Sequence, residues 1–299
     1  DTPHPREAAA DYRCWPMLDF QSGIDDHLTG VTHIIRGIDL QDSAKKQRFV
    51  YDYFGWEYPE VVHWGHVQVD AYDVKLSTST LKEKIEAGEY DGWDDPRVPT
   101  IKSLRRRGIR GQAIVDAMVE LGTSTSDVDL PMSNIYAHNR ELVDDETDRA
   151  FAVREGVRFE IAGGPGSAHP PVHPDYEDRG ERDIPVGDSV MLEPDDVPEV
   201  GERVWLKGFG PFGREGDTLV YTDESIDIVR EKDVPVVHWV PTDGSVSVRM
   251  RTMDGDVAGV AEPGLLSYDR DEMLQFERIG FVRVDDHTAD ESVVYYTHD

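Results

Sequence analysis

Two kinds of hydrophobic spacing divide the chain, and the change falls near residue 150. Early in the chain, the short apolar runs VTHIIRG and VVHWGHVQVD flank the segment QDSAKKQRFVYDYFGW, whose apolar positions have helical spacing. Asp42 or Ser43 can cap this helix at its start, and Gly55 can end it. Its predicted apolar face consists of Phe49, Val50, Tyr53 and Phe54. Strand, helix and strand in this order predict part of an α/β layer.

Residues 81–150 carry mainly helical patterns. The segment IKSLRRRGIRGQAIVDAMVELG has four apolar residues at helical spacing, namely Ile114, Val115, Met118 and Leu121. A second helical candidate is MSNIYAHNRELVDDETDRA. We therefore expect a helical region after the α/β layer.

From Phe151 onward the hydrophobic period is two. Val246, Val248 and Met250, for example, alternate with Arg249 and Arg251, which we expect to point outward. The Gly/Pro-rich segment 163–174 cannot form a regular element, and we find no internal repeat. The pattern predicts an all-β sandwich or barrel region. Its strand candidates are VRFEIAG, SVMLEP, RVWLKGFG, TLVYTD, VPVVHWV, SVSVRMRTMDG, MLQFERIGFVRVDD and SVVYYTHD.

Composition changes this picture mainly through charge. The chain has 61 acidic and 31 basic residues, a formal net charge of −30, and few of its basic residues are lysine. Scattered carboxylates together with many aromatic residues favour a folded protein adapted to molar salt, where charge repulsion is screened over ~3 Å. No apolar run is long enough to cross a membrane, and the N-terminus does not have the pattern of a signal peptide. The single cysteine, Cys14, excludes an internal disulfide and a four-cysteine zinc site.

Three segments carry candidate chemistry: LDFQSGIDDHLTGVTHIIRG at 18–37, VKLSTST at 74–80 and GWDDPRVPTIKSLRRRG at 92–108. Each also has an ordinary structural explanation. The first segment can supply helix caps and ion pairs, the second can be a hydroxyl-rich turn, and the third can be a solvated charged face. Three successive arginines in an acidic, lysine-poor chain favour a phosphate-binding face for the last segment.

In this order and spacing, the three segments resemble the glutamyl/glutaminyl subgroup of class I aminoacyl-tRNA synthetases, in its archaeal and eukaryotic form. The first resembles the amino-acid-binding segment, the second the Lys-Met-Ser-Lys-Ser loop, and the third the signature of the subgroup. The runs VVHWV and LQFERIGFVRVD resemble segments of the anticodon-binding barrels.

The resemblance implies a multidomain protein. Residues 1–80 would be the C-terminal part of a Rossmann catalytic domain with the Lys-Met-Ser-Lys-Ser-like loop, and 81–150 a helical subdomain that contacts the tRNA stem. Residues 151–299 would form the β-barrel anticodon-binding region, with two barrels.

Arg36 distinguishes the two amino acids within this subgroup. Glutamyl enzymes have an arginine at the position matched by Arg36, facing the side-chain carboxylate of the substrate. Glutaminyl enzymes have a small neutral residue there, because an unpaired buried charge costs several kcal/mol. The resemblance therefore implies glutamate, with Ser22 and Leu18 at other pocket positions; Leu18 departs from the Tyr often found there.

The resemblance also implies ATP as a substrate, with Mg²⁺. Asp39 would lie near the ribose, and Lys75, Ser77 and Ser79 would act on the phosphates as adenylate forms. The second lysine of the loop signature is Thr78 here, which leaves less positive charge in the loop.

For partners, the resemblance implies glutamate tRNA, and we leave open whether glutamine tRNA is also charged. Arg105, Arg106 and Arg107 would contact tRNA, and neutralising all three should weaken binding without unfolding the barrels. We expect a cytoplasmic monomer without zinc and without membrane contact. The histidines are dispersed, and His169 and His173 are expected to face solvent.

The His-Ile-Gly-His motif of class I synthetases is absent, so we expect the chain to begin after it. As given, the chain should then bind tRNA but make no adenylate. Two alternatives stay open, namely a glutaminyl-tRNA synthetase and a non-catalytic tRNA-binding module.

Overall fold

The computed structural model describes residues 11–12, 14–69 and 77–299. The described residues form two compact units, one drawn from residues 1–70 and 118–131 and the other from 71–117 and 132–299. We call them the first and the second unit. Among the described residues, no helix is both long and apolar enough to span a membrane.

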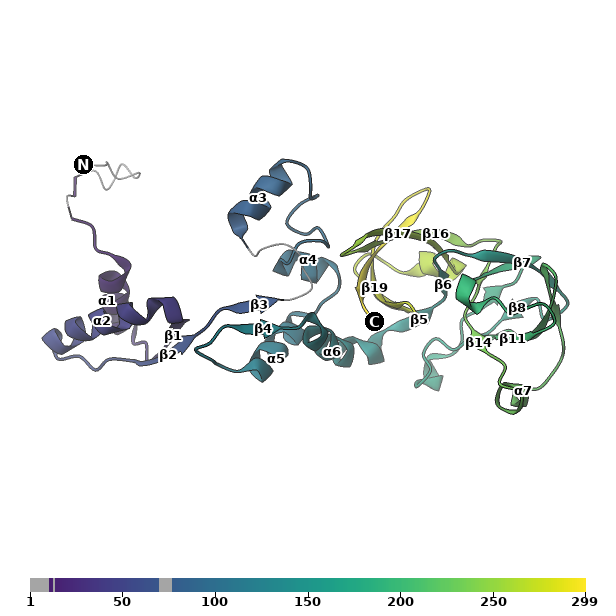
Figure 1. Ribbon diagram of the computed structural model, residues 1–299, viewed down its shortest axis with the longest axis horizontal. Coiled ribbons are helices and arrows are strands. Elements are labelled where there is room, and N and C mark those ends of the chain that lie inside the picture. The colour runs from purple at the N-terminus through teal and green to yellow at the C-terminus, as the bar shows by residue number, and fades with distance from the viewer. Residues whose placement is uncertain (1–10, 13, 70–76) are drawn as a thin grey trace. The chain divides into compact units, whose positions relative to one another are not determined.

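The first unit contains the predicted strand–helix–strand arrangement, and the strands β1 and β2 pair in parallel (Figure 1). A second parallel pair joins β3 to β4, which comes from the far end of the unit in sequence. Its elements are α1 (Leu18–Thr29), β1 (His33–Gly37), the 3₁₀ turn η2 (Ile38–Leu40), α2 (Gln41–Phe54), β2 (Glu60–Trp64), β3 (Val67–Val69) and β4 (Val128–Leu130).

Helix α2 ends as predicted but buries a different face. It stops at Gly55, whose φ of 68° is the left-handed conformation that glycine adopts easily. It starts at Gln41, before both predicted caps, Asp42 and Ser43, and no side chain caps it. The predicted apolar face is wrong within the described chain, because Phe49 and Tyr53 are 76% and 84% exposed. The buried stripe is Ala44, Gln47 and Tyr51, which have the same helical spacing.

The individual helices of the helical region are shorter than the sequence pattern predicts. The predicted helix after residue 100 is broken at Gly108, whose φ is 95° and whose absent Cβ would lie 2.5 Å from the sulfur of Met273. Glycine is therefore needed for both conformation and close approach. The helices are α3 (Thr78–Glu86), α4 (Ile101–Arg106), α5 (Gly111–Leu121) and α6 (Met132–Val143).

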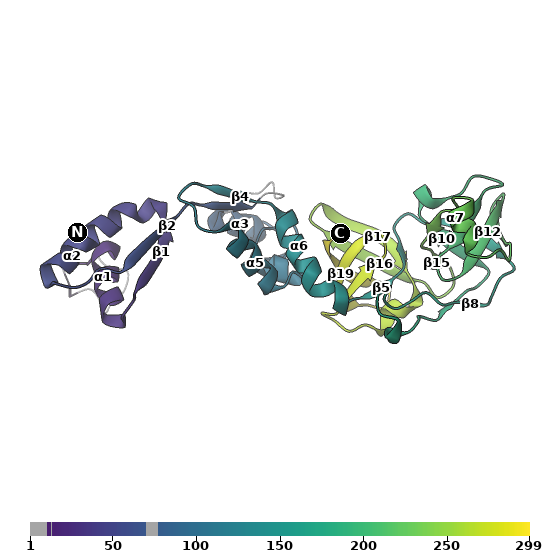
Figure 2. The same cartoon turned by 90° about the horizontal axis from the view of Figure 1, so that it is seen from below.

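Two seven-stranded, barrel-like sheets form most of the second unit (Figures 1 and 2). The first sheet consists of β7 (Val157–Ala162), β10 (Ser189–Leu192), β11 (Arg203–Leu206), β12 (Gly210–Glu215), β13 (Thr218–Tyr221), β14 (Val236–Val237) and β15 (Val240–Pro241). The second consists of β5 (Asp148–Ala150), β6 (Ala152–Val153), β16 (Val246–Thr252), β17 (Gly255–Ala261), β18 (Met273–Phe276), β19 (Gly280–His287) and β20 (Ser292–His298). Short elements near the first sheet are β8 (Ser167–Ala168), β9 (Ile184–Pro185) and α7 (Asp227–Glu231).

The two sheets have the same topology. Their strand orders are β14-β11-β12-β13-β7-β10-β15 and β5-β18-β19-β20-β16-β17-β6. In both orders, the first and the fourth neighbouring pairs are parallel and the other pairs are antiparallel. The two sheets are therefore alike in topology, although no internal repeat was found in the sequence.

Short strands are exchanged between the two sheets. β5 and β6 immediately precede the first sheet in sequence but pair with β18 and β17 of the second. β14 and β15 immediately precede β16 in sequence but pair with β11 and β10 of the first. Figure 2 shows β5 beside the strands of the second sheet. Each sheet is thus completed by the segment that leads into the other.

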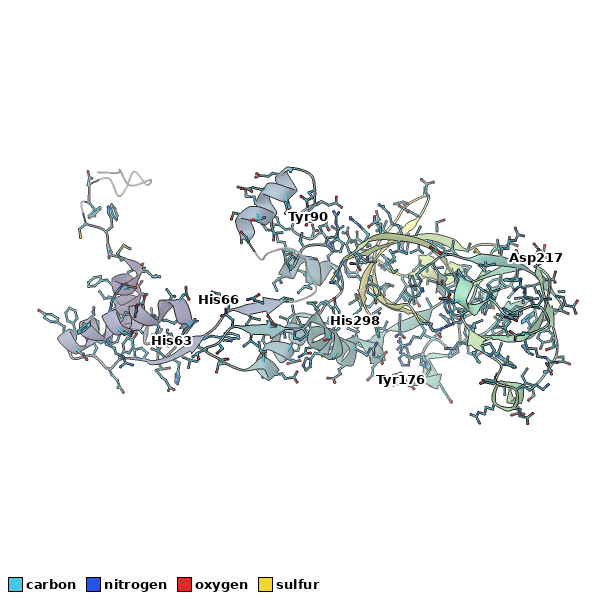
Figure 3. All side chains as sticks on the ribbon, in the orientation of Figure 1. His63, His66, Tyr90, Tyr176, Asp217 and His298 are labelled. Atoms are coloured by element: carbon cyan, nitrogen blue, oxygen red, sulfur yellow. The ribbon has the colours of Figure 1, made fainter. Side chains whose placement is uncertain are left out.

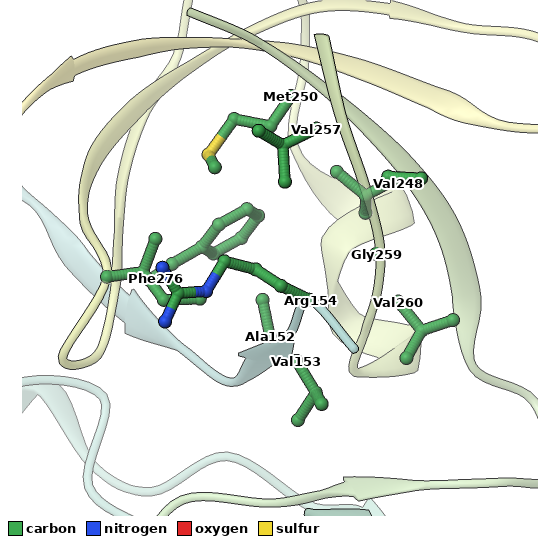
Figure 4. A pocket seen from close by; sticks show the side chains of 11 residues that line it. Ala152, Val153, Arg154, Val248, Met250, Val257, Gly259, Val260 and Phe276 are labelled. Atoms are coloured by element: carbon green, nitrogen blue, oxygen red, sulfur yellow. The ribbon is translucent and has the colours of Figure 1, made fainter. Parts of the chain in front are cut away.

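The segment 150–153 contributes to two cores. Ala150 and Ala152 pack in the core of the second sheet, whereas Phe151 and Val153 pack in the core of the first. Successive side chains of an extended segment point to opposite sides, so alternation explains this division. The ring of Phe151 lies 6.2 Å from that of Trp239, in the corresponding connecting segment. Inside the second sheet, Met250 and Phe276 face a small apolar hollow (Figure 4).

Candidate functional site

Arg36, the predicted carboxylate ligand, lies on β1 with a side chain that is 12% exposed. Its Nη1 donates to Oε1 of Gln47 on α2 at 3.0 Å, and its Nη2 lies 3.8 Å from Oδ2 of Asp26 on α1. Strand β1 and the two helices therefore bring a cation, an amide and a carboxylate together.

Ser22 lies in the same cluster. Its Oγ accepts a hydrogen bond of 2.7 Å from Nε2 of Gln47 and donates to the carbonyl oxygen of Leu18 at 2.8 Å. The Leu18 side chain is itself exposed. The structure thus groups Arg36 and Ser22 around Gln47, and joins Leu18 to them through its backbone.

Gln47 was not predicted as a site residue. It is fully buried, and its Oε1 also accepts a hydrogen bond of 2.9 Å from the hydroxyl of Tyr58. Gln47 lies three positions after Ala44 and four before Tyr51, which places it on the buried stripe of the helix. This spacing is the feature of the sequence from which its burial could have been predicted. Burial, as the largest cause, raises the pKa of both Tyr51 and Tyr58, so both phenols are protonated and can donate at neutral pH.

The last two residues of β2 begin the sequence His63-Trp64-Gly65-His66, whose His-x-Gly-His spacing the sequence analysis wrongly took to be absent. It differs from His-Ile-Gly-His by one residue and leads into β3 instead of a helix. Nε2 of His63 and Nε1 of Trp64 are buried and lack a hydrogen-bond partner among the described residues. His63 is the register neighbour of Arg36 in the parallel sheet. The carboxyl ends of parallel strands are where such sheets bind ligands, so these nitrogens are further candidate ligand contacts.

The predicted ATP-binding residues are only partly described. Asp39 is exposed in η2. Its Oδ1 lies where a side chain at position 37 would place its Cβ, and Gly37 leaves that space open. Lys75 lies outside the described residues. Ser77 precedes α3, and its hydroxyl is 3.2 Å from that of Ser79 in the first turn. The structure thus places the two loop hydroxyls together at the start of a helix.

The segment 92–108 is held by its own charged residues. Asp95 is fully buried, and its carboxylate accepts hydrogen bonds from the backbone N–H groups of Asp91 and Arg97 and from the Arg97 guanidinium. Burial opposes ionisation of Asp95, but these hydrogen bonds outweigh it and lower the pKa to about 2. A negative charge is therefore part of the folded turn.

A pH dependence follows from Asp95. Its pKa is lower in the folded state than the ordinary 3.8, so its contribution is complete above about pH 4 and is lost as the pH falls through about 2. We expect Asp95→Asn to lower the free energy of unfolding by about 2 kcal/mol at neutral pH and by progressively less in acid. Thermal melts of both proteins between about pH 6 and pH 2, at constant molar salt, measure this. A stability difference that is independent of pH would contradict it.

The three successive arginines have different environments. Arg105 is exposed. Arg106 is half-buried, pairs with Asp94 at 2.8 Å and with Asp285 at 3.0 Å, and stacks on the ring of Tyr295. Arg107 is 1% exposed, and its guanidinium donates to the backbone oxygens of residues 296 and 297 in β20. RNA contact by the set remains a prediction, but only Arg105 of the three is an exposed cation.

Two other sequence expectations need correction. His173 is buried, with Nε2 3.0 Å from the backbone oxygen of Asp144 and its ring 4.8 Å from that of Tyr176, which Figure 3 labels. His169 faces solvent as expected. Arg251 does not point freely outward, because its side chain is 16% exposed and pairs with Asp91 and Asp256. Among the described residues, no group of three or more His, Cys, Asp or Glu side chains could hold a metal ion.

Comparison with known proteins gives the family. Three sequence profiles match: the catalytic domain of class I tRNA synthetases (E and Q) at residues 5–145, and two anti-codon binding domains of the same family at 147–228 and 236–285. The chain belongs to the class I tRNA synthetases for glutamate and glutamine. The matched segments indicate a catalytic part followed by anticodon-binding domains, which here are the barrel-like sheets. The finer division of the catalytic part at residue 80 stays a prediction.

Several curated members of this synthetase family are similar over the whole chain. It is 68% identical to a glutamate–tRNA ligase of Natronomonas pharaonis, covering 100% of this chain and 52% of that protein. It is 64% identical to a glutamate–tRNA ligase of Haloarcula marismortui, covering 100% and 53%. One from Methanosarcina acetivorans is 43% identical, covering 99% and 52%. The chain thus spans about half the length of the curated relatives it matches.

The two most similar of these relatives come from haloarchaea, which agrees with the acidic composition. Because the net charge is −30, we expect folding of this synthetase chain to require molar KCl, which screens repulsion among the carboxylates. Circular dichroism melts from about 3 M down to about 0.1 M salt should show a falling melting temperature. A melting temperature that is constant over this range would refute halophilic adaptation.

Proposed function

We propose that the protein ligates L-glutamate to its tRNA in an ATP-dependent reaction through glutamyl-adenylate, as a glutamate–tRNA ligase, and that this chain supplies only part of that enzyme. The observation that carries the proposal is Arg36, a mostly buried guanidinium hydrogen-bonded to the neutral amide of Gln47. A buried cation held in this way retains its charge for an anionic ligand. The side-chain carboxylate of glutamate is such a ligand, whereas the amide of glutamine is not.

The reaction has two steps. The α-carboxylate of glutamate attacks the α-phosphorus of ATP, which forms glutamyl-adenylate and releases pyrophosphate. A ribose hydroxyl at the 3′ end of the tRNA then attacks the activated carbonyl carbon and releases AMP. The protein contributes by positioning the reactants and by neutralising developing charge.

Each predicted site residue has a role in this scheme. Arg36 binds the substrate side chain, and Ser22 and Leu18 form the pocket around it. Asp39 accepts a hydrogen bond from the ATP ribose. Lys75, Ser77 and Ser79 donate to the phosphates; the proximity of the two hydroxyls, 3.2 Å apart, supports a joint role. Mg²⁺ accompanies the ATP phosphates, and no residue of this chain is assigned to hold it.

For tRNA, we propose that the barrel-like sheets bind the anticodon region and that Arg105 contacts a backbone phosphate. Arg105 is exposed, whereas the neighbouring Arg107 is buried. Glutamine tRNA is a further possible substrate, because the anticodon-binding profiles cover both members of the family.

The proposed function is tested on the complete gene product. Glutamate-dependent ATP–pyrophosphate exchange tests the first step, and transfer of labelled glutamate to glutamate tRNA and to glutamine tRNA tests the second. Exchange with glutamine in preference to glutamate would favour the glutaminyl alternative. Binding of tRNA without exchange for either amino acid would favour a non-catalytic tRNA-binding module.

A further inference from the structure

Gln47 is placed to do more than fill the interior of the first unit. It is fully buried and hydrogen-bonds to three side chains, those of Ser22, Arg36 and Tyr58. Two of these were predicted from sequence to lie in the amino-acid pocket. A buried polar residue with all these bonds formed fixes the geometry of its partners.

The direction of each hydrogen bond is determined. The guanidinium of Arg36 and the hydroxyl of Tyr58 both donate to Oε1 of Gln47, at 3.0 and 2.9 Å. Nε2 of Gln47 donates to Oγ of Ser22, which can accept because its own proton goes to the backbone oxygen of Leu18. An amide turned the other way would place NH₂ against the guanidinium. Only one orientation of the amide therefore satisfies this network, and it fixes the position of Nη1 of Arg36.

The neutrality of Gln47 is as important as its position. A carboxylate at this position would form a charge-assisted pair with Arg36, roughly twice as strong as a neutral hydrogen bond. The substrate carboxylate would then have to displace an internal partner. The nearby carboxylate, that of Asp26, forms an ion pair with Nη2 at 3.8 Å, too long for a hydrogen bond, so it holds the cation less tightly than a carboxylate at position 47 would. The amide thus orients the cation without neutralising it.

We propose that Gln47 is a positioning residue that sets the preference for glutamate over glutamine, by holding Arg36 in place while leaving its charge available. This inference rests on the proposed function. It concerns the affinity for the amino acid, so its effect falls on the KM for glutamate more than on kcat.

The experiment uses pyrophosphate exchange by the complete gene product with glutamate and with glutamine as separate substrates. Gln47→Glu is expected to raise the KM for glutamate by ~10–100-fold, to change kcat by less, and to lower the glutamate-to-glutamine ratio of kcat/KM by at least about tenfold. Gln47→Met, which keeps the length of the side chain but removes the strong acceptor, should raise the KM for glutamate by about tenfold. Gln41→Glu adds the same charge at the exposed start of the same helix and is the matched control.

Further arms separate positioning from a purely structural role. In an Arg36→Ala background, Gln47→Glu should no longer change the KM for glutamate, because the group through which it acts is gone. Circular dichroism melts of every variant report folding. If Gln47→Glu folds and leaves the KM for glutamate unchanged, or reduces activity with both amino acids equally, the positioning role is overturned. If the unmodified protein activates no glutamate, the proposed function fails first, and this inference fails with it.

Discussion

Replacing Arg36 by alanine in the complete gene product is expected to lower glutamate-dependent pyrophosphate exchange by more than ~10²-fold. The reason is the loss of a largely buried, charge-assisted contact worth ~3–5 kcal/mol, of which each ~1.4 kcal/mol corresponds to tenfold in rate. Exchange with glutamine should fall much less, because an amide gains little from the cation. Initial rates over a range of each amino acid measure both effects.

The control for this substitution is Lys45→Ala on α2, which removes a cation that is exposed and pairs with Asp42. Its exchange rates should match those of the unmodified protein. Equal losses with glutamate and glutamine in Arg36→Ala would mean that Arg36 supports the fold through Gln47 and Asp26 and does not select the substrate.

Arg107→Met is expected to lower the free energy of unfolding by about 3 kcal/mol, because it removes a charged donor from several buried acceptors. The guanidinium donates to the backbone oxygens of Tyr296 and Thr297 and to the hydroxyl of Tyr136, at 3.1, 2.6 and 2.8 Å. The substitution leaves those acceptors without this donor in a buried region. Urea titration followed by circular dichroism in molar KCl measures the loss.

Arg105→Met is the matched comparison two residues earlier. Because Arg105 is exposed, the free energy of unfolding of this variant should stay within about 0.5 kcal/mol of that of the unmodified protein. Its affinity for glutamate tRNA in filter binding should fall. Neutralising all three arginines should therefore destabilise the protein, contrary to the expectation from sequence alone. A stable Arg107→Met variant with weakened tRNA binding would instead support an RNA contact by Arg107.

The arginine run shows why sequence could not assign these roles. Successive residues of a helix are turned by about 100°, so three adjacent side chains cannot all face one partner. Composition and spacing identify the unusual cluster, but the packing of α4 against β20 decides which member is buried. Gln47 was missed for a related reason: the helix pattern was analysed for apolar residues, and Phe49 and Tyr53 were assigned to the face that is in fact exposed.

Local patterns predicted the elements better than their partners. The strand–helix–strand arrangement around α2 and most strands after residue 156 follow from period and turn residues. The strand β17 was missed because GDVAGVA is rich in glycine and alanine. The exchange of β5 and β6 for β14 and β15 involves strands of two or three residues paired over long sequence separations. No local signal specifies such pairing, although it determines the topology of the β region.

The exchanged strands impose an order on assembly during translation. All strands of the first sheet lie between residues 157 and 241, so that sheet can close once this stretch has left the ribosome. β5 and β6 emerge earlier but pair only with β18 and β17, far downstream. The second sheet also needs β20, which ends at residue 298. Phe151 and Val153 can therefore join the core of the completed first sheet before the core of the second sheet, to which Ala150 and Ala152 belong, has formed. We therefore expect the first sheet to form before the second during synthesis.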